Sequence, residues 1–314
     1  MNVKIKSFEM SYLADVLKCW NENLVYDLIN EERFTEVILL DDNFDPNLFK
    51  VAFVDNQCVG FAFGIKRKIP YLERGLEPTR GWINMIAVNQ DYRHQKIGTA
   101  LVQSLEADLK KLGATEITLC AYSPNYFTPG IDLRYEAAIP FFESLNYPFN
   151  NEEVVSMQRD LWDFTMSETT KTKIADLNTQ GISIVPYEKK YMLQLQNFLL
   201  SQFGAGWKRN ALIAMQRHEA EKVILLVVNS EDKILGFCMR KIDGNDGRFG
   251  PFGVDESLRS HGIGGVLFET MMQDMKSRGI PYLYFLWTGG AAMRFYLRHG
   301  VKVYRTYRLS RKEI

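Results

Sequence analysis

Two short stretches of the chain combine glycine and arginine at a spacing suited to binding an anion. Residues 259–267 read RSHGIGGVL, and residues 93–101 read RHQKIGTAL. A strand-like segment precedes each stretch and a helical pattern follows it, so each is expected at a helix N-terminus, where backbone N–H groups lack partners. Glycine lets the backbone approach a ligand closely, and arginine adds charge and paired hydrogen bonds. We therefore predict that these stretches hold phosphate groups.

The two stretches differ from the familiar nucleotide-binding loops. The chain has no G-x-G-x-x-G with an acidic residue about 20 positions further on, and no G-x-x-x-x-G-K-[ST]. A plain glycine turn that caps a helix is the alternative interpretation. Because strand, arginine, glycine and helix follow one another in the same order twice, we favour a phosphate-binding loop.

A second pattern with chemical potential follows the full glycine phrase. Residues 292–300 read AMRFYLRHG, which places Tyr296 in a helical segment. A phenol with a pKa near 10 is protonated at neutral pH and can donate a proton to a leaving group. The alternative is a tyrosine on the buried face of an amphipathic helix. In the first half of the chain, Phe142 stands at the position of Tyr296 and Asn146 at that of Gly300.

The elements that must position these residues occur in the same order twice. Each half predicts strand, helix, hairpin, strand, helix, strand, helix and strand. Since 314 residues exceed what one hydrophobic core usually carries, we expect two domains, over residues 1–166 and 182–314. Residues 167–181 are rich in Ser, Thr and Lys, which is typical of a linker.

The two patterns together resemble those of the GNAT (GCN5-related N-acetyltransferase) superfamily. The first resembles its R-x-x-G-x-G acetyl-CoA signature, and the second its A-x-x-x-Y-x-x-x-G helix. The matching residues are Arg259, Gly262 and Gly264, with Gly265 next, and then Ala292, Tyr296 and Gly300. The resemblance covers almost the whole chain. It implies an α/β (α+β) fold of two tandem domains, each with a mixed, mostly antiparallel central sheet flanked by helices.

The resemblance also implies acetyl-CoA as acyl donor and the primary amine of a small molecule as acceptor. In that superfamily the loop amides hold the CoA pyrophosphate, the preceding strand pairs with the pantetheine arm, and a tyrosine protonates the departing thiolate. Tyr296 would be that acid. The implied cofactor-binding residues are Phe252, Gly253, Val254, Arg259, Ser260, His261, Gly262, Ile263, Gly264 and Gly265 in the second half, and Ile86, Ala87, Val88, Arg93, Lys96, Ile97, Gly98 and Thr99 in the first.

The two halves differ at the positions that matter for this chemistry. In the first half Lys96 replaces the first loop glycine and Phe142, which has no proton to give, replaces the tyrosine. We therefore predict that the second domain catalyses and that the first is a degenerate copy that shapes the acceptor site. Catalysis in the first domain, or a protein that binds or senses acyl-CoA without catalysis, are the alternatives.

The acceptor side and the general base are less clearly encoded. The first half carries an insertion, YSPNYFTPGIDLRYEA at residues 122–137, which either contacts the substrate or lies at a domain interface. Its candidate substrate contacts are Tyr126, Phe127 and Asp132. The strand segment FGPFGV contains no acidic residue, so the base is either a nearby aspartate or water. The nearby aspartates are Asp243, Asp246 and Asp255.

Composition excludes several classes of partner. Lys plus Arg and Asp plus Glu number 38 each, so the net charge is zero and no field steers the protein to nucleic acid or an acidic membrane. Four widely spaced cysteines and no histidine cluster predict reduced thiols and no metal. The segment MNVKIKSFEM lacks the apolar core of a signal peptide. We expect a cytoplasmic monomer or homodimer.

Overall fold

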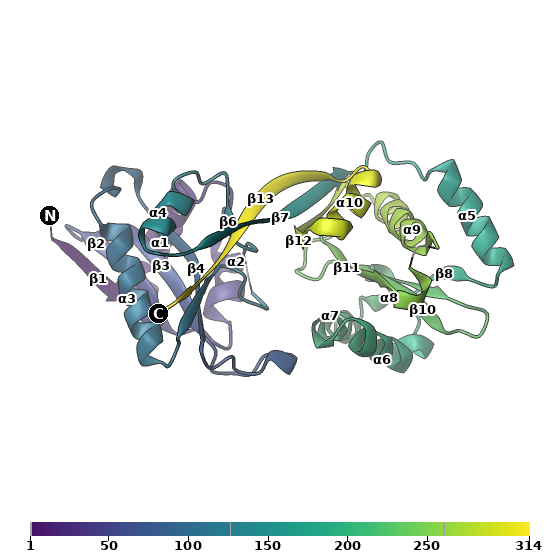
Figure 1. The fold of residues 1–314 in the computed structure, drawn as a ribbon, viewed down its shortest axis with the longest axis horizontal. Helices are drawn as coiled ribbons and strands as arrows, with labels where there is room; N and C mark the ends of the chain where they lie inside the picture. Colours follow the sequence, from purple (N-terminus) through teal and green to yellow (C-terminus); the bar gives the residue numbers. More distant parts are fainter. Residues whose placement is uncertain (1, 126, 260) are drawn as a thin grey trace. The chain divides into compact units, whose positions relative to one another are not determined.

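The computed structural model describes residues 2–125, 127–259 and 261–314 and divides the chain into two units (Figure 1). Unit 1 comprises Met1–Val154 together with Arg305–Ile314, and unit 2 comprises Val155–Tyr304. The C-terminal segment thus belongs to the unit that begins the chain.

Unit 1 is built on one mixed sheet. Strands β1 to β4 pair antiparallel in chain order, β4 pairs parallel with β5, and the residues of β13 from Arg311 to Glu313 pair antiparallel with β5. Its elements are β1 (Val3–Ser7), α1 (Leu13–Asn23), α2 (Glu31–Phe34), β2 (Phe49–Val54), β3 (Gln57–Lys66), β4 (Arg80–Val88), α3 (Ile97–Lys111), β5 (Glu116–Leu119), β6 (Ile131–Asp132) and α4 (Ala138–Ser144), with the first part of β7 (Phe149–Asp160) and the last part of β13 (Lys302–Glu313).

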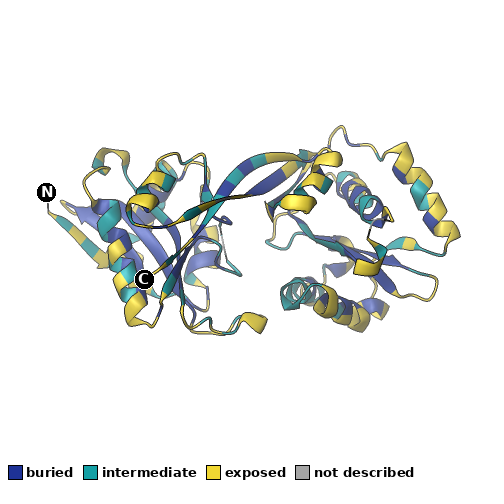
Figure 2. Ribbon diagram, in the orientation of Figure 1, coloured by how far each residue is buried: buried dark blue, intermediate teal, exposed yellow. Residues whose placement is uncertain are grey.

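The central strands of unit 1 are buried because helices cover both faces of the sheet (Figure 2). On one face Val16 and Trp20 of α1 pack with Phe61 of β3 in a cluster rich in aromatic rings. On the other face the apolar side of α3, including Leu101 and Leu105, packs against the sheet. Burial of such side chains is the main favourable term in folding.

Unit 2 repeats this arrangement with different edges. Strands β8 to β11 form an antiparallel sheet in chain order, and β12 pairs antiparallel with residues Val155–Asp160 of β7. Its elements are α5 (Glu168–Thr179), β8 (Ser183–Pro186), α6 (Met192–Gln202), α7 (Ala205–Gln216), α8 (Ala220–Val223), β9 (Ile224–Val228), β10 (Ile234–Arg240), β11 (Phe249–Val254), α9 (Ile263–Ser277), β12 (Tyr282–Thr288) and α10 (Gly290–Arg298). The cluster that contains α9 and α10 lies on one face, and α6 and α7 cover the other.

The expected fold class is confirmed: both units have sheets of mixed or antiparallel strands flanked by helices. The segment expected to be a linker instead forms helix α5. Ser167 caps it by accepting a hydrogen bond from the Thr170 N–H at 3.1 Å, and Leu177 is buried in the core of unit 2. The polar composition of residues 167–181 reflects the exposed side of this helix, which has only a narrow apolar face.

The division of the chain also differs from the expected boundaries at residues 166 and 182. Residues 155–166 lie in unit 2 and residues 305–314 in unit 1. Strand propensity marks both segments as strands but does not reveal which neighbour each will pair with. Two tandem domains therefore remain our description of the chain, with each sheet completed by a strand from outside the expected span.

The C-terminal strand is fixed in unit 1 by a buried ion network. Arg305 Nε donates to Asp132 Oδ2 at 2.7 Å, and its Nη2 lies 2.8 Å from Asp27 Oδ1. Tyr135 donates its hydroxyl hydrogen to Asp27 Oδ2 at 2.9 Å, and Arg134 makes a second ion pair with Asp132. Burial alone would raise the pKa of Asp132, but these cations and hydrogen bonds more than offset it, so that its pKa lies below its ordinary value of 3.8.

We predict that Arg305→Met destabilises unit 1 by about 3–5 kcal/mol, because it leaves Asp27 buried without its cation and Asp132 with Arg134 alone. The matched control is Arg311→Met, on the same strand, whose ion pair with Glu116 is exposed and contributes less than about 1 kcal/mol. Urea unfolding measures both. Since a lowered carboxyl pKa stabilises only above its ordinary value, the loss in Arg305→Met should shrink as pH falls below 3.8. Equal stability of the two variants would contradict this role.

Candidate functional site

In unit 2 the strand before the full glycine phrase has one unpaired edge. Gly236 to Cys238 of β10 pair with Phe252 to Val254 of β11. On its other side, the described residues show one bridge toward β12, between Arg248 and Tyr284, just before β11 begins. The backbone of Phe252–Val254 therefore has free hydrogen-bonding groups on that side. This is the geometry that β-augmentation by an extended ligand requires.

Unit 1 has the same opening. Arg80 to Ile83 of β4 pair in parallel with Glu116 to Leu119 of β5. Beyond this point Cys120 and Ala121 adopt positive φ of 57° and 56°, so the chain turns away from β4. No pairing of residues 84–88 with β5 follows among the described residues. The expected ligand strand Ile86–Val88 thus has a free edge too.

A bulge lies at the start of each opening. In unit 1 Asn84 is the extra residue, between Ile83 paired with Gly64 and Met85 paired with Phe63. Asn84 is 2% exposed, and neither atom of its side-chain amide has a hydrogen-bond partner among the residues that the structure describes. A buried amide without partners is costly, so this group favours a ligand or water in the opening of unit 1.

The loop of unit 2 places its backbone for anion binding. The Asp255 carboxylate accepts from the Ser257 N–H at 2.9 Å and forms a short turn, after which Gly262 has a left-handed φ of 79° and α9 begins at Ile263. The first N–H groups of α9 have no intrahelical partner. The Arg259 side chain is half-exposed, and its Nη1 lies 3.3 Å from Glu256 Oε1. The predicted Ser260 lies outside the described residues.

The remaining predicted residues of this loop lie at the same helix start. His261 has its Nδ1 3.1 Å from the Arg259 carbonyl oxygen. Gly264 is in the first turn of α9, where an added Cβ would lie 3.5 Å from the Phe252 ring. At Gly265 an added Cβ would lie 3.2 Å from the His299 ring, so only a small residue fits without a shift.

The loop of unit 1 has the same backbone conformation before its helix, but its arginine has different hydrogen-bond partners. Lys96 takes the position of Gly262, with φ of 62°, and α3 begins at Ile97. Arg93 donates to the Val88 carbonyl oxygen at 3.0 Å and to Asn23 Oδ1 at 3.2 Å. The predicted Gly98 and Thr99 follow in the first turn of α3.

Tyr296 lies on α10 with its ring among aromatic side chains of unit 2. The nearest is Phe285 of β12, with ring centroids 4.4 Å apart, and Phe252 of β11 lies 6.3 Å away. Its hydroxyl has no hydrogen bond to another described residue. Burial, with a smaller contribution from Cys238, holds the pKa of Tyr296 above its ordinary value of 10.0. The phenol is therefore protonated at neutral pH.

The corresponding helix of unit 1 has a buried aromatic ring at the position of Tyr296, but that ring has no hydroxyl group. Phe142 is buried, and its ring centroid lies 5.3 Å from that of Tyr147. Both helices end at a left-handed residue, Asn146 with φ of 63° and Gly300 with φ of 76°. Asparagine tolerates this conformation, so the helix C-terminus is preserved.

An aromatic wall beside β11 is a feature that the repeat does not reveal. The rings of Phe203 and Trp207 are stacked with centroids 4.4 Å apart. Both rings occupy the space that a side chain at Gly253 would need. The glycine therefore allows the α6–α7 segment to pack closely on the strand, and only the bare glycine in FGPFGV hinted at it.

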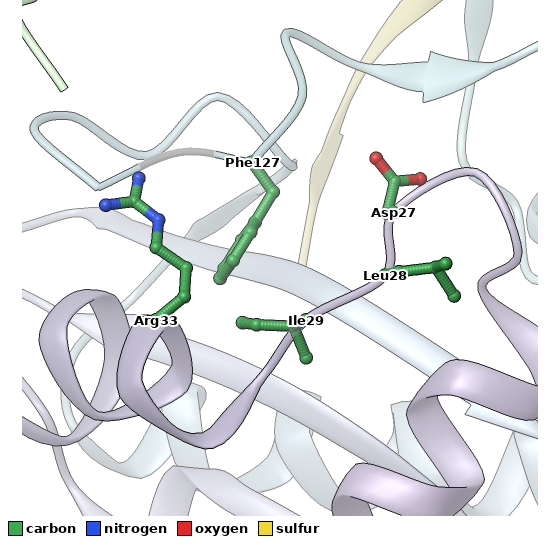
Figure 3. A pocket seen from close by; sticks show the side chains of 5 residues that line it. All are labelled: Asp27, Leu28, Ile29, Arg33 and Phe127. Carbon is green, nitrogen blue, oxygen red and sulfur yellow. The ribbon is translucent and has the colours of Figure 1, made fainter. Parts of the chain in front are cut away.

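The predicted acceptor loop of unit 1 contributes to a small pocket of about 140 Å³ (Figure 3). The Phe127 ring points toward Ile29, and Arg33 lies beside them. The other lining residues are Asp27 and Leu28. Asp132 is instead held by Arg305 and Arg134, away from any role as a free carboxylate. Tyr126 lies outside the described residues.

The aspartates considered as a general base are all engaged elsewhere. Asp243 accepts a hydrogen bond from the Tyr284 hydroxyl at 3.2 Å, Asp246 pairs with Arg240, and Asp255 caps the loop turn. Among the described residues no group of His, Cys, Asp and Glu is arranged to hold a metal ion, and no helix is long and apolar enough to cross a membrane.

Comparison with known proteins supports the resemblance in both halves. The model of the acetyltransferase (GNAT) family matches residues 12–128 and again residues 192–301. A curated acetyltransferase of Sodalis glossinidius is 29% identical over 150 residues, which cover 48% of this chain and 84% of that protein. One from Pectobacterium atrosepticum is 28% identical over 134 residues, which cover 43% of this chain and 73% of that protein.

Solved structures share the fold over nearly the whole chain. A glucosamine N-acetyltransferase region of a fungal multi-domain β-N-acetylglucosaminidase superposes with a TM-score of 0.80 at 18% identity over 99% of this chain, which spans 38% of that protein's length. A tandem GNAT protein from the clavulanic acid pathway gives 0.65 at 13% identity, covering 99% of this chain and 98% of that one. The two matched segments, one in each unit, show that the chain is a tandem member of the acetyltransferase (GNAT) family.

Proposed function

We propose that unit 2 transfers the acetyl group of acetyl-CoA to the primary amine of a small molecule. The observation that carries this proposal is the combination, within one unit, of a free strand edge, a glycine loop at a helix start and a protonated tyrosine. Unit 1 keeps the first two features and has Phe142 in place of the tyrosine.

In the proposed reaction the neutral amine attacks the thioester carbonyl carbon, the new N–C bond forms and the C–S bond breaks. The amine proton passes to water, because the nearby aspartates are engaged. Tyr296 donates its hydroxyl proton to the departing sulfur and regains one from solvent. The loop amides and Arg259 bind the phosphates, and Phe252–Val254 orient the pantetheine arm.

The acceptor is proposed to be compact and to approach β11 from the side of Phe203 and Trp207. A stacked aromatic pair offers a flat apolar surface to a small molecule. The fungal relative named for glucosamine makes glucosamine the first amine to assay. The similarity between the two structures supports a shared fold. The acceptor of this chain is to be identified by the assay.

We predict that Tyr296→Phe lowers turnover about 100-fold or more while CoA affinity is retained, because a general acid contributes on that order. Thiol release with acetyl-CoA and a panel of amines measures turnover, and fluorescence titration measures affinity. Tyr282→Phe, at an exposed position of β12, is the matched control. Because the pKa of Tyr296 is raised, its deprotonation should not limit turnover below pH 10. Wild-type turnover in Tyr296→Phe would refute the acid assignment.

A second candidate is catalysis in unit 1. The unpaired amide of Asn84 and the pocket beside Phe127 favour it, since both point to a ligand in that unit. In this case another group or water would have to protonate the thiolate.

The two candidates are separated by a matched pair of substitutions, Gly264→Val and Gly98→Val, each in the first turn of the helix after its loop. We expect Gly264→Val to abolish turnover and to lower acetyl-CoA affinity more than tenfold, because the Cβ would already lie 3.5 Å from the Phe252 ring and a branched side chain would crowd the proposed ligand strand. Gly98→Val should retain turnover. Thermal unfolding confirms that both variants are folded. The opposite pattern would assign catalysis to unit 1, and CoA binding without turnover on any amine would support a non-catalytic CoA-binding protein.

A further inference from the structure

Helix α5 brings a lysine to the first glycine of the loop in unit 2. The Cε atom of Lys173 lies 3.6 Å from the point where a Cβ at Gly262 would stand. Lys173 is partly buried, and it forms no ion pair with another described residue. Its neighbour Lys171, two residues earlier, is exposed and pairs with Glu168 at 2.7 Å.

The position of Lys173 is set by the packing of α5 on α9 (Figure 1). The Ser167 N–H at the start of α5 donates to Glu269 Oε2 at 3.0 Å, and the Ser167 hydroxyl lies 3.1 Å from the same oxygen. Glu269 belongs to α9 and is buried. Further along, Ile174 and Leu177 pack into the core that contains α9. These contacts hold the face of α5 that carries Lys173 against the loop.

The charges gathered at this point favour an anion. The start of α9 carries the positive end of the helix dipole, and a cation placed there is destabilising unless a negative group lies between. Lys173 and Arg259 both add positive charge near that end. The acidic group nearest to Arg259, Glu256, is on the exposed turn before the loop.

The two loops differ in where the lysine beside them comes from. Lys96 and Gly262 occupy equivalent positions, each left-handed and each directly before the long helix. In unit 1 the residue at that position is itself a lysine. In unit 2 it is a glycine, and the Lys173 side chain of α5 extends to it. Each unit thus has one lysine at the same corner of its loop.

We propose that Lys173 is a phosphate-binding residue of the acetyl-CoA site, contacting the diphosphate of CoA and taking the place that Lys96 has in unit 1. This inference rests on the proposed function of unit 2. It assigns a binding role to helix α5, which lies outside the repeated part of the chain. The loop of unit 1 has a positive charge of its own in Lys96, and in unit 2 Lys173 would supply the corresponding charge from α5.

The test is a titration of the full chain with CoA and with dephospho-CoA, which lacks the 3′-phosphate. We expect Lys173→Gln to weaken CoA binding about tenfold, as for loss of one charge-assisted contact. Lys171→Gln should bind as wild type does. The loss should be the same with dephospho-CoA. A loss that disappears with dephospho-CoA, or equal binding by the two variants, would overturn the proposal.

A rescue variant tests the equivalence of the two lysines. Adding Gly262→Lys to Lys173→Gln should restore most of the affinity, since Lys96 shows that lysine is accepted in this left-handed position. A double variant no better than Lys173→Gln would contradict the equivalence. If wild type binds no CoA, or if Gly264→Val leaves binding unchanged, the proposed function fails. If Gly264→Val abolishes binding while Lys173→Gln matches Lys171→Gln, only the role of Lys173 fails.

Discussion

The free N–H groups at the start of α9 are the constraint around which unit 2 is arranged. They follow β11 after a loop of residues 255–262, whose last residue, the left-handed Gly262, directly precedes the helix. Among the described residues the strand edge that leads to them has a single bridge, Arg248 to Tyr284, and the helix that follows packs against Tyr296 through Phe268. An extended ligand with a negative end could therefore lie along the strand and finish at the helix. The acyl end of such a ligand would then lie on the side of the tyrosine.

Unit 1 shows which parts of this arrangement belong to the fold and which belong to chemistry. Its strands part at the same point, its long helix begins after a left-handed residue, and its last helix ends in one. These features persist although Lys96 and Asn146 replace glycines, because the backbone geometry can be kept at modest cost by such residues. Phe142 is buried as Tyr296 is, but it has no hydroxyl group to act as the proposed acid. We therefore regard unit 1 as a retained scaffold with a ligand opening of its own.

The sequence predicted the family and the fold class, whereas the roles of the site residues stay predictions. The glycine phrases, the Tyr296 helix and the repeat order depend on short-range pattern, and the family and the fold are confirmed. The pairing partners of the strands could not be predicted from the sequence. The segment from Arg305 onward has the pattern of a strand, but nothing in that pattern indicates that Arg305 forms ion pairs with Asp27 and Asp132. Helix α5 was missed because its apolar face is narrow. The proximity of Lys173 to Gly262 could not be predicted either, because it depends on the tertiary packing of α5 on α9.

The most direct test of the central claim is hydrogen–deuterium exchange of the full chain with and without acetyl-CoA. Amides that hold a phosphate group or pair with an extended ligand exchange more slowly, so the method reports which loop is occupied. The account predicts slower exchange over residues 252–266, with residues 168–179 also protected where α5 meets the loop. Slower exchange confined to residues 86–100, with no change over residues 252–266, would contradict it.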